Sequence, residues 1–198
     1  MRRSMIPMLV ALGALSTTLA AQSNNAPAQS IKERPHAIGF GFFATLGAYW
    51  QMEGIEIGYA RRLQRGFAAV SFSGRVGTFI NESTMLGGTK GVAFGATVSG
   101  RTRMKTIAQF GQDEKGTGIG LDMTFEVTGY TASGSPLSQG SRWAAISVLP
   151  AISIGTGDAP HFGIVIGPTA FLGRGKPSMR GMLAFRGEAP LARRERRP

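Results

Sequence analysis

Seven charged residues stand at alternating positions in otherwise apolar or small-residue stretches, and their types could support ion pairing or proton transfer. They are Glu56, Arg75, Arg101, Arg103, Asp122, Glu126 and Arg180. Even spacing places such residues on one side of an extended chain. Buried charges must be paired or neutralised. We therefore predict a buried ion network in which Arg101 or Arg103 lies near Asp122 or Glu126.

This network could have either of two roles. In the structural role, which we favour, the paired charges fill the interior and hold neighbouring strands together. The alternative is a relay that passes protons or a solute along the charged groups. Arg62 and Arg186 are expected on the same face as the network.

The chain has little else that could carry out catalysis or bind a metal. It has two histidines, His36 and His161, and no cysteine. Neither histidine belongs to a cluster with metal-ligand spacing, so a transition-metal site is poorly supported. Neither has a serine or an orienting carboxylate beside it in the sequence, although folding could bring a Ser–His pair together. We predict no catalytic residue, no metal ligand and no cofactor.

The stretch from Ile38 to Trp50 has an apolar residue at every second position. Successive side chains of a strand point to opposite faces, so this alternation predicts a strand. At about 3.3 Å per residue it would reach roughly 40 Å. Soluble strands are usually only about 5–6 residues long. A tilted strand of this length could cross the apolar band of about 25 Å on an outer-membrane barrel.

The same alternation recurs along the chain. It predicts strands at about 37–50, 54–63, 67–80, 90–104, 117–130, 142–155, 161–172 and 179–187. Short connections without a helical pattern favour sequential hairpins, and closure of the sheet removes its edges. Pro150 should interrupt the ladder of the sixth strand, because proline has no N–H to donate. The predicted fold class is all-β, an antiparallel up-and-down closed transmembrane β-barrel of about eight strands.

The composition of the two strand faces decides which one points inward. One face is apolar, and the other is rich in Gly, Ser, Thr and charge; membrane barrels turn the apolar face outward. Charged residues make up only 17% of the chain, less than the roughly 25–35% of a soluble surface. Tyr49, Trp50, Tyr130 and Trp143 fall at one end of the predicted strands, where an interfacial aromatic girdle would lie. The narrow lumen is expected to be lined by small and polar side chains.

The two ends of the chain differ from this alternating middle. Arg2 and Arg3 precede an apolar run from Met5 to Leu15, and small residues follow, so we predict a secretory signal peptide cleaved after Ala20. The absence of cysteine excludes disulfides and a lipid-modified cysteine. The predicted organisation is a signal peptide at 1–20, a flexible leader at 21–35, a β-barrel at 36–187 and a basic disordered tail at 188–198.

The chain has a net charge of +11 at pH 7, so anionic molecules are its expected binding partners. An exported chain rarely meets nucleic acid, so we predict none as a partner. Anionic lipid head groups fit the basic charge better. We expect a monomer that contacts outer-membrane lipids.

Together, the signal peptide, the strand pattern and the girdle resemble small eight-stranded outer-membrane β-barrel proteins of the OmpA/OmpX-like type. The resemblance covers about residues 36–187. The segment Gly181-Met182-Leu183-Ala184-Phe185 is similar to the assembly signal of such barrels, which ends in an aromatic residue, but here a basic tail follows it. The resemblance implies a porin-like fold in the cell outer membrane of a Gram-negative-type envelope, inserted by the outer-membrane assembly machinery.

Three functions remain open at this stage. The first, which we favour, is an outer-membrane barrel with a structural or interaction role and no enzymatic activity. The second is a lipid-modifying outer-membrane enzyme, which requires a histidine and a hydroxyl at the lipid boundary. The third is a soluble, secreted, lipocalin-like carrier with its apolar face around an apolar ligand.

Overall fold

The computed structural model describes residues 35–47, 50–81, 91–110, 117–133, 140–156 and 159–191. Nine strands run through these residues: β1 His36–Leu46, β2 Trp50–Arg62, β3 Ala69–Asn81, β4 Val92–Arg101, β5 Lys105–Gln109, β6 Gly118–Ala132, β7 Arg142–Thr156, β8 Ala159–Leu172 and β9 Ser178–Pro190. No helix in this described part is long and apolar enough to cross a membrane.

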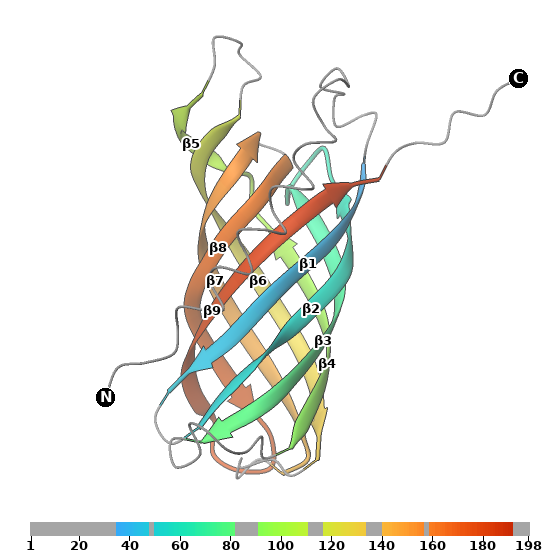
Figure 1. Cartoon of the computed structure of the whole chain (residues 1–198), viewed down its shortest axis with the longest axis vertical. Coiled ribbons are helices and arrows are strands. Elements are labelled where there is room, and N and C mark those ends of the chain that lie inside the picture. Colours follow the sequence, from blue (N-terminus) through green and yellow to red (C-terminus); the bar gives the residue numbers. More distant parts are fainter. Residues whose placement is uncertain are drawn as a thin grey trace, which may run out of the picture.

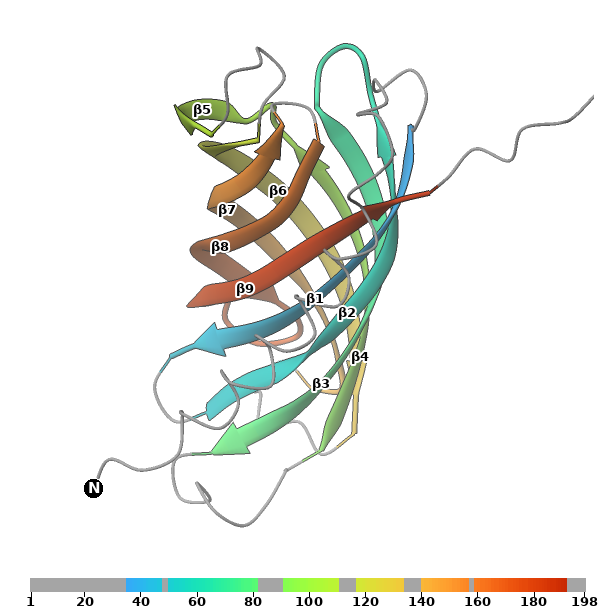
Figure 2. The same cartoon turned by 45° about the horizontal axis from the view of Figure 1, so that its top comes forward.

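The sheet closes on itself to form a barrel (Figure 1). Neighbouring strands are antiparallel, and β1 pairs with both β2 and β9, which joins the first strand to the last. β4 and β5 both pair with β6 and act as one interrupted strand of the barrel. The prediction of an all-β, antiparallel, closed barrel of eight strands is therefore confirmed. Figure 2 shows β5 lying beyond the end of β4, at one end of the barrel.

The first turn lies earlier than predicted. β1 ends at Leu46, and Trp50 begins β2 rather than ending the first strand. This shift changes which residues point inward, because even-numbered residues face outward in β1 but inward in β2. Trp50 is consequently a lumen residue.

The last strand is longer than predicted. β9 continues to Pro190, so Glu188 belongs to the barrel and not to a disordered tail. The predicted signal peptide, nearly all of the predicted leader and residues 192–198 lie outside the described residues.

Pro150 interrupts the sheet on one side only. It pairs with Met123 of β6, and β7 runs through it without a break. On the other side, β7 pairs with β8 up to Ser147↔Thr169 and again from Ala151↔Val165, and the register is the same before and after this interruption. The predicted local interruption is confirmed, since proline cannot donate to the ladder.

The outer surface of the barrel is apolar and its interior holds the charges. Ile57, Phe72 and Ile166 are 67%, 65% and 55% exposed, whereas Arg75 and Glu126 are 2% and 3% exposed. The alternation therefore runs apolar outward and polar inward, which is the reverse of a soluble barrel.

One half of the lumen is filled by an aromatic cluster. Its rings come from Trp50, Phe79, Tyr130, Trp143 and Phe171, with centroid separations of 5.4–5.9 Å between neighbours. All five side chains are buried. The expected aromatic girdle is therefore wrong for Trp50, Tyr130 and Trp143, which gather at one end of the barrel but point inward. The expected small, polar lining is interrupted in this half by the large rings, although Thr45 is fully buried beside Met52 of the same cluster.

Candidate functional site in the barrel lumen

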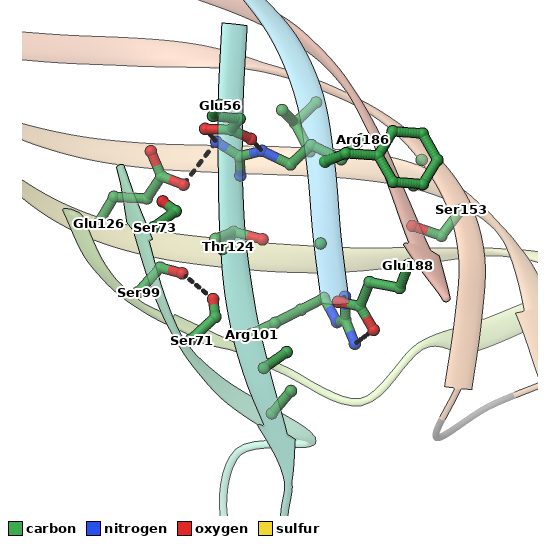
Figure 3. Close-up of a pocket in the computed structure, with 18 of the residues that line it drawn as sticks. Glu56, Ser71, Ser73, Ser99, Arg101, Thr124, Glu126, Ser153, Arg186 and Glu188 are labelled. Atoms are coloured by element: carbon green, nitrogen blue, oxygen red, sulfur yellow. Dashed lines mark hydrogen bonds and ion pairs between the residues drawn. The ribbon is translucent and has the colours of Figure 1, made fainter. Parts of the chain in front are cut away.

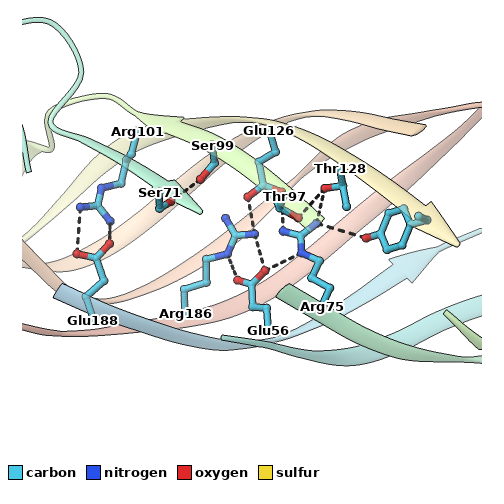
Figure 4. Close-up of polar contacts among 11 residues, drawn as sticks. Glu56, Ser71, Arg75, Thr97, Ser99, Arg101, Glu126, Thr128, Arg186 and Glu188 are labelled. Atoms are coloured by element: carbon cyan, nitrogen blue, oxygen red, sulfur yellow. Dashed lines mark hydrogen bonds and ion pairs between the residues drawn. The ribbon is translucent and has the colours of Figure 1, made fainter. Parts of the chain in front are cut away.

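Two arginines and two glutamates form a closed ring of ion pairs at the boundary between the two halves of the lumen (Figure 4). Arg75 donates from Nε to Glu56 Oε2 and from Nη2 to Glu126 Oε2, both at 2.8 Å. Arg186 reaches the other oxygens of the same two carboxylates, at 2.5 Å from Glu56 Oε1 and 2.6 Å from Glu126 Oε1. Each carboxylate is thus shared by two guanidinium groups, and this four-residue ring is neutral.

A glycine on the intervening strand β1 allows the ring to form. Gly41 of β1 pairs with Glu56 on one side and with Arg186 on the other. A Cβ on Gly41 would lie 2.9 Å from Glu56 Oε1 and 2.7 Å from the Phe185 carbonyl oxygen. The missing side chain therefore leaves the space in which Glu56 and Arg186 meet.

Arg75 also ties the ring to the aromatic half of the lumen. Its Nη1 lies 3.2 Å from Thr128 Oγ1 and 3.4 Å from the Tyr130 hydroxyl. Its guanidinium carbon lies 5.2 Å from the centre of the Phe43 ring. A buried guanidinium needs partners for its N–H donors. Because Arg75 has these partners, its side chain can fill and stabilise the lumen.

A second ion cluster lies nearer the end of the barrel where β9 finishes. Arg101 Nη1 is 2.5 Å from Glu188 Oε1, and Arg62 Nη2 is 3.9 Å from Glu188 Oε2. Arg101 and Asp122 line the same cavity, as predicted, but the ion pair expected for Arg101 with Asp122 or Glu126 is not found, because Glu188 binds the Arg101 side chain. Glu126 is instead bound by Arg75 and Arg186.

The remaining two arginines of the predicted network lie elsewhere. Arg103 is exposed just after β4 and donates to the backbone carbonyls of Leu63 and Gln64, so it joins neither lumen cluster. Arg180 lies at the aromatic end, where it donates to the Trp50 carbonyl at 2.8 Å and stacks 3.5 Å from the Trp50 ring centre. Of the seven predicted residues, the structure joins Glu56, Arg75 and Glu126 in one ring.

A cavity of about 80 Å³ lies between the ring and the Arg101–Glu188 pair (Figure 3). Its wall includes Glu56, Glu126 and Arg186 of the ring and Arg101 and Glu188 of the second cluster. The rest of the wall is formed by small, hydroxyl-bearing and apolar residues, among them Gly39, Ser153 and Phe162. Asp122 also lines it. This residue is 8% exposed, and neither of its carboxylate oxygens has a hydrogen-bond partner of normal geometry.

Glu188 is a site residue that the sequence analysis does not predict, because the predicted barrel ends at residue 187 and β9 continues to Pro190. A signal for it existed: Arg186 and Glu188 continue the alternation of β9 beyond Phe185. Arg186 was placed on the correct face, but its role in the ring depends on the register of three strands.

On the outer surface, His36 Nδ1 is hydrogen-bonded to the Tyr59 hydroxyl, and the two rings stack with centroids 5.6 Å apart. This contact brings together a histidine and a hydroxyl, but the hydroxyl is a phenol and no serine takes part. Within the described ranges, no group of three or more acidic or histidine residues could hold a metal ion.

In comparisons with known proteins, no family model matches the chain and no curated protein sequence matches it.

Proposed function

We propose that this chain is an outer-membrane β-barrel protein with a structural or interaction role. The observation that carries the proposal is the arrangement of the two strand faces. Large apolar side chains surround the barrel, while Glu56, Arg75 and Glu126 are buried and paired inside it. A continuous apolar outer surface is costly in water and is favourable in lipid.

The strand lengths support the same proposal. Apart from the short β5, the strands contain 10 to 15 residues. At about 3.3 Å per residue and a tilt of about 40°, they would cover roughly 25–38 Å along the barrel axis. This matches the apolar band of about 25 Å on membrane barrels.

The contents of the lumen favour a structural role over a relay or a pore. Both carboxylates of the ring are held by two arginines each, so neither is free to pass a proton onward. The aromatic cluster then fills the next layer of the lumen. An eight-stranded barrel filled in this way leaves no continuous aqueous path.

The two alternatives have less support. A lipocalin-like carrier needs an apolar cavity around its ligand, whereas the wall of this small cavity carries six charged side chains beside its apolar ones. A lipid-modifying enzyme would need an activated nucleophile on the outer surface. The His36–Tyr59 pair offers a phenol, which is a weak nucleophile without a strong base and an orienting group.

Cell fractionation combined with electrophoresis of unheated and boiled samples tests this proposal. We expect the protein in the outer-membrane fraction, with a mobility that changes on boiling because the closed barrel resists detergent. Recovery as a soluble monomer without detergent would contradict the proposal.

A further inference from the structure

Three polar side chains that the proposed function does not use lie together on the outer surface, at one rim of the barrel. β1 begins at His36 and β2 ends at Arg62, at the same end of the barrel (Figure 1). His36 and Arg61 are direct cross-strand partners there, and Tyr59 is the diagonal neighbour of His36. All three lie on the outward side of their strands, so their side chains are within reach of one another.

The contact between His36 and Tyr59 fixes the orientation of the imidazole. The two rings stack with centroids 5.6 Å apart and an angle of 24° between their planes, and the Tyr59 hydroxyl is hydrogen-bonded to His36 Nδ1. When the hydroxyl donates to Nδ1, the ring proton of the neutral imidazole is on Nε2, which is then a hydrogen-bond donor. The pair therefore supplies one N–H donor beside Arg61.

Arg61 supplies the positive charge of this cluster. Its side chain is exposed and has no hydrogen bond or ion pair with any other residue that the structure describes. A guanidinium has five N–H donors in a planar fork that matches the oxygens of a phosphate group. Arg61 and His36 are therefore suited to bind one phosphate between them.

The outer surface next to this cluster is apolar. Towards the middle of the barrel, β1 and β2 carry Ile38, Phe40 and Ile57 on their outward side, and these side chains are 41%, 44% and 67% exposed. With the barrel in a membrane, as proposed above, they contact acyl chains, and the cluster lies at the depth of the lipid head groups. A lipid whose chains lie along these residues would hold its phosphate at the level of Arg61.

The charges around the cluster distinguish between classes of phospholipid. Among the described residues, every exposed charged side chain is an arginine or a lysine, and the carboxylates are buried or only partly exposed. The ammonium of phosphatidylcholine or phosphatidylethanolamine would therefore find no exposed carboxylate here, and Arg61 would repel it. An anionic phospholipid without an ammonium, such as phosphatidylglycerol, avoids this repulsion.

We propose that Arg61 and His36 bind the phosphate of an anionic phospholipid, and that Tyr59 positions the imidazole for this contact. The Arg61 guanidinium and His36 Nε2–H donate to the phosphate oxygens, while the acyl chains pack on the apolar faces of β1 and β2. This site rests on the proposed membrane location and names the kind of lipid that the barrel contacts at this rim.

The experiment titrates lipid probes into the full chain folded in micelles of the uncharged detergent dodecyl maltoside. Dihexanoyl-phosphatidylglycerol, dihexanoyl-phosphatidylcholine and glycerol phosphate are added separately, while NMR signals of the His36 ring and Arg61 Nε–H are followed. We expect phosphatidylglycerol to bind about tenfold more tightly than either other probe, since only it combines an unopposed anionic charge with acyl chains. Equal affinities of the two lipids, or no shifts with phosphatidylglycerol, would overturn the proposal. Glycerol phosphate binding as tightly as phosphatidylglycerol would also overturn it, because the site would then select a soluble phosphate.

Variants locate the binding site. Arg61→Gln removes the charge and should weaken phosphatidylglycerol binding about tenfold. His36→Phe keeps a ring that can stack on Tyr59 but removes the N–H donor, and it should weaken binding by about the same factor. Arg142→Gln removes an exposed arginine at the other end of the barrel and should leave binding unchanged. Equal losses in Arg61→Gln and Arg142→Gln would overturn the proposal, because general charge attraction would then account for the binding.

The site and the membrane location can fail separately. Recovery of the protein as a soluble monomer in the fractionation experiment would contradict the membrane location, and the lipid site with it. A barrel that is found in the outer membrane but binds both lipids equally would overturn the phosphate site alone.

Discussion

Arg75 of β3 and Glu126 of β6 form an ion pair across the intervening β4, with Nη2 2.8 Å from Oε2 and almost no exposed surface on either side chain. Removing one partner leaves a buried charge without compensation, which typically costs about 3–5 kcal/mol. We expect Glu126→Gln and Arg75→Met each to destabilise the barrel by about this amount. The double variant should cost clearly less than the sum, as measured by urea unfolding from detergent micelles.

A second cycle provides the control for this prediction. Arg101 pairs with Glu188 and not with Glu126, so the coupling energy between Arg101→Met and Glu126→Gln should be clearly smaller than that between Arg75→Met and Glu126→Gln. Strong coupling between Arg101 and Glu126, together with additive effects of the Arg75 and Glu126 substitutions, would show that Glu126 pairs with Arg101 and not with Arg75.

The inward orientation of both tryptophans predicts a specific fluorescence result. The chain has two tryptophans, and Trp50 and Trp143 are 7% and 5% exposed. Lipids with brominated acyl chains should therefore quench the emission of the protein only weakly. Phe94→Trp places a third tryptophan on the outer surface and should add strongly quenched emission. Equally strong quenching without that substitution would show that Trp50 and Trp143 face lipid.

The alternation of residues predicted most of the fold, because a period of two is set locally by the strand backbone. Applied to the whole of each strand, the same rule also places Tyr130 and Trp143 on the inward face, together with Thr128 and Ala145. Trp50 could not be placed by the rule, because the turn after Leu46 changes the parity between β1 and β2. The location of that turn depends on which residues pair across the hairpin.

The ring was less predictable than the strands. Arg75 and Glu56 are direct cross-strand partners, so a register for β2 and β3 would have found them. Arg186 meets Glu56 only because Gly41 separates them on β1. Such a contact spans three strands and 130 residues of sequence, and no local pattern encodes it.

Glu188 should contribute to stability, although the sequence pattern predicted that it belongs to a disordered tail. Glu188 Oε1 lies 2.5 Å from Arg101 Nη1, and Glu188 Oε2 lies 3.9 Å from Arg62 Nη2. The side chains of Arg101 and Glu188 are both partly exposed. Glu188→Gln should cost about 1.5–3 kcal/mol, the range for hydrogen bonds to charged groups. Urea unfolding measures the loss, and stability equal to that of the unaltered chain would show that the pair contributes nothing.

Arginine substitutions on the outer surface distinguish a membrane barrel from a soluble one. Val127 and Ile107 are both exposed and apolar, at 54% and 66%, but Val127 lies on the barrel wall and Ile107 on β5 at its end. In lipid, Val127→Arg should cost about 2–4 kcal/mol and Ile107→Arg about 0–1 kcal/mol. Folding into lipid vesicles measures both. Equal tolerance would indicate that both positions face water.

The most direct test of the outward apolar face is the accessibility of single spin labels in lipid bilayers. The chain has no cysteine, so Val127→Cys and Ile107→Cys can each be labelled at a unique position. We expect a label at Val127 to be accessible to oxygen and shielded from a water-soluble nickel complex, whereas a label at Ile107 should be accessible to the nickel complex. Equal accessibility of both labels to the nickel complex would contradict a membrane-embedded barrel.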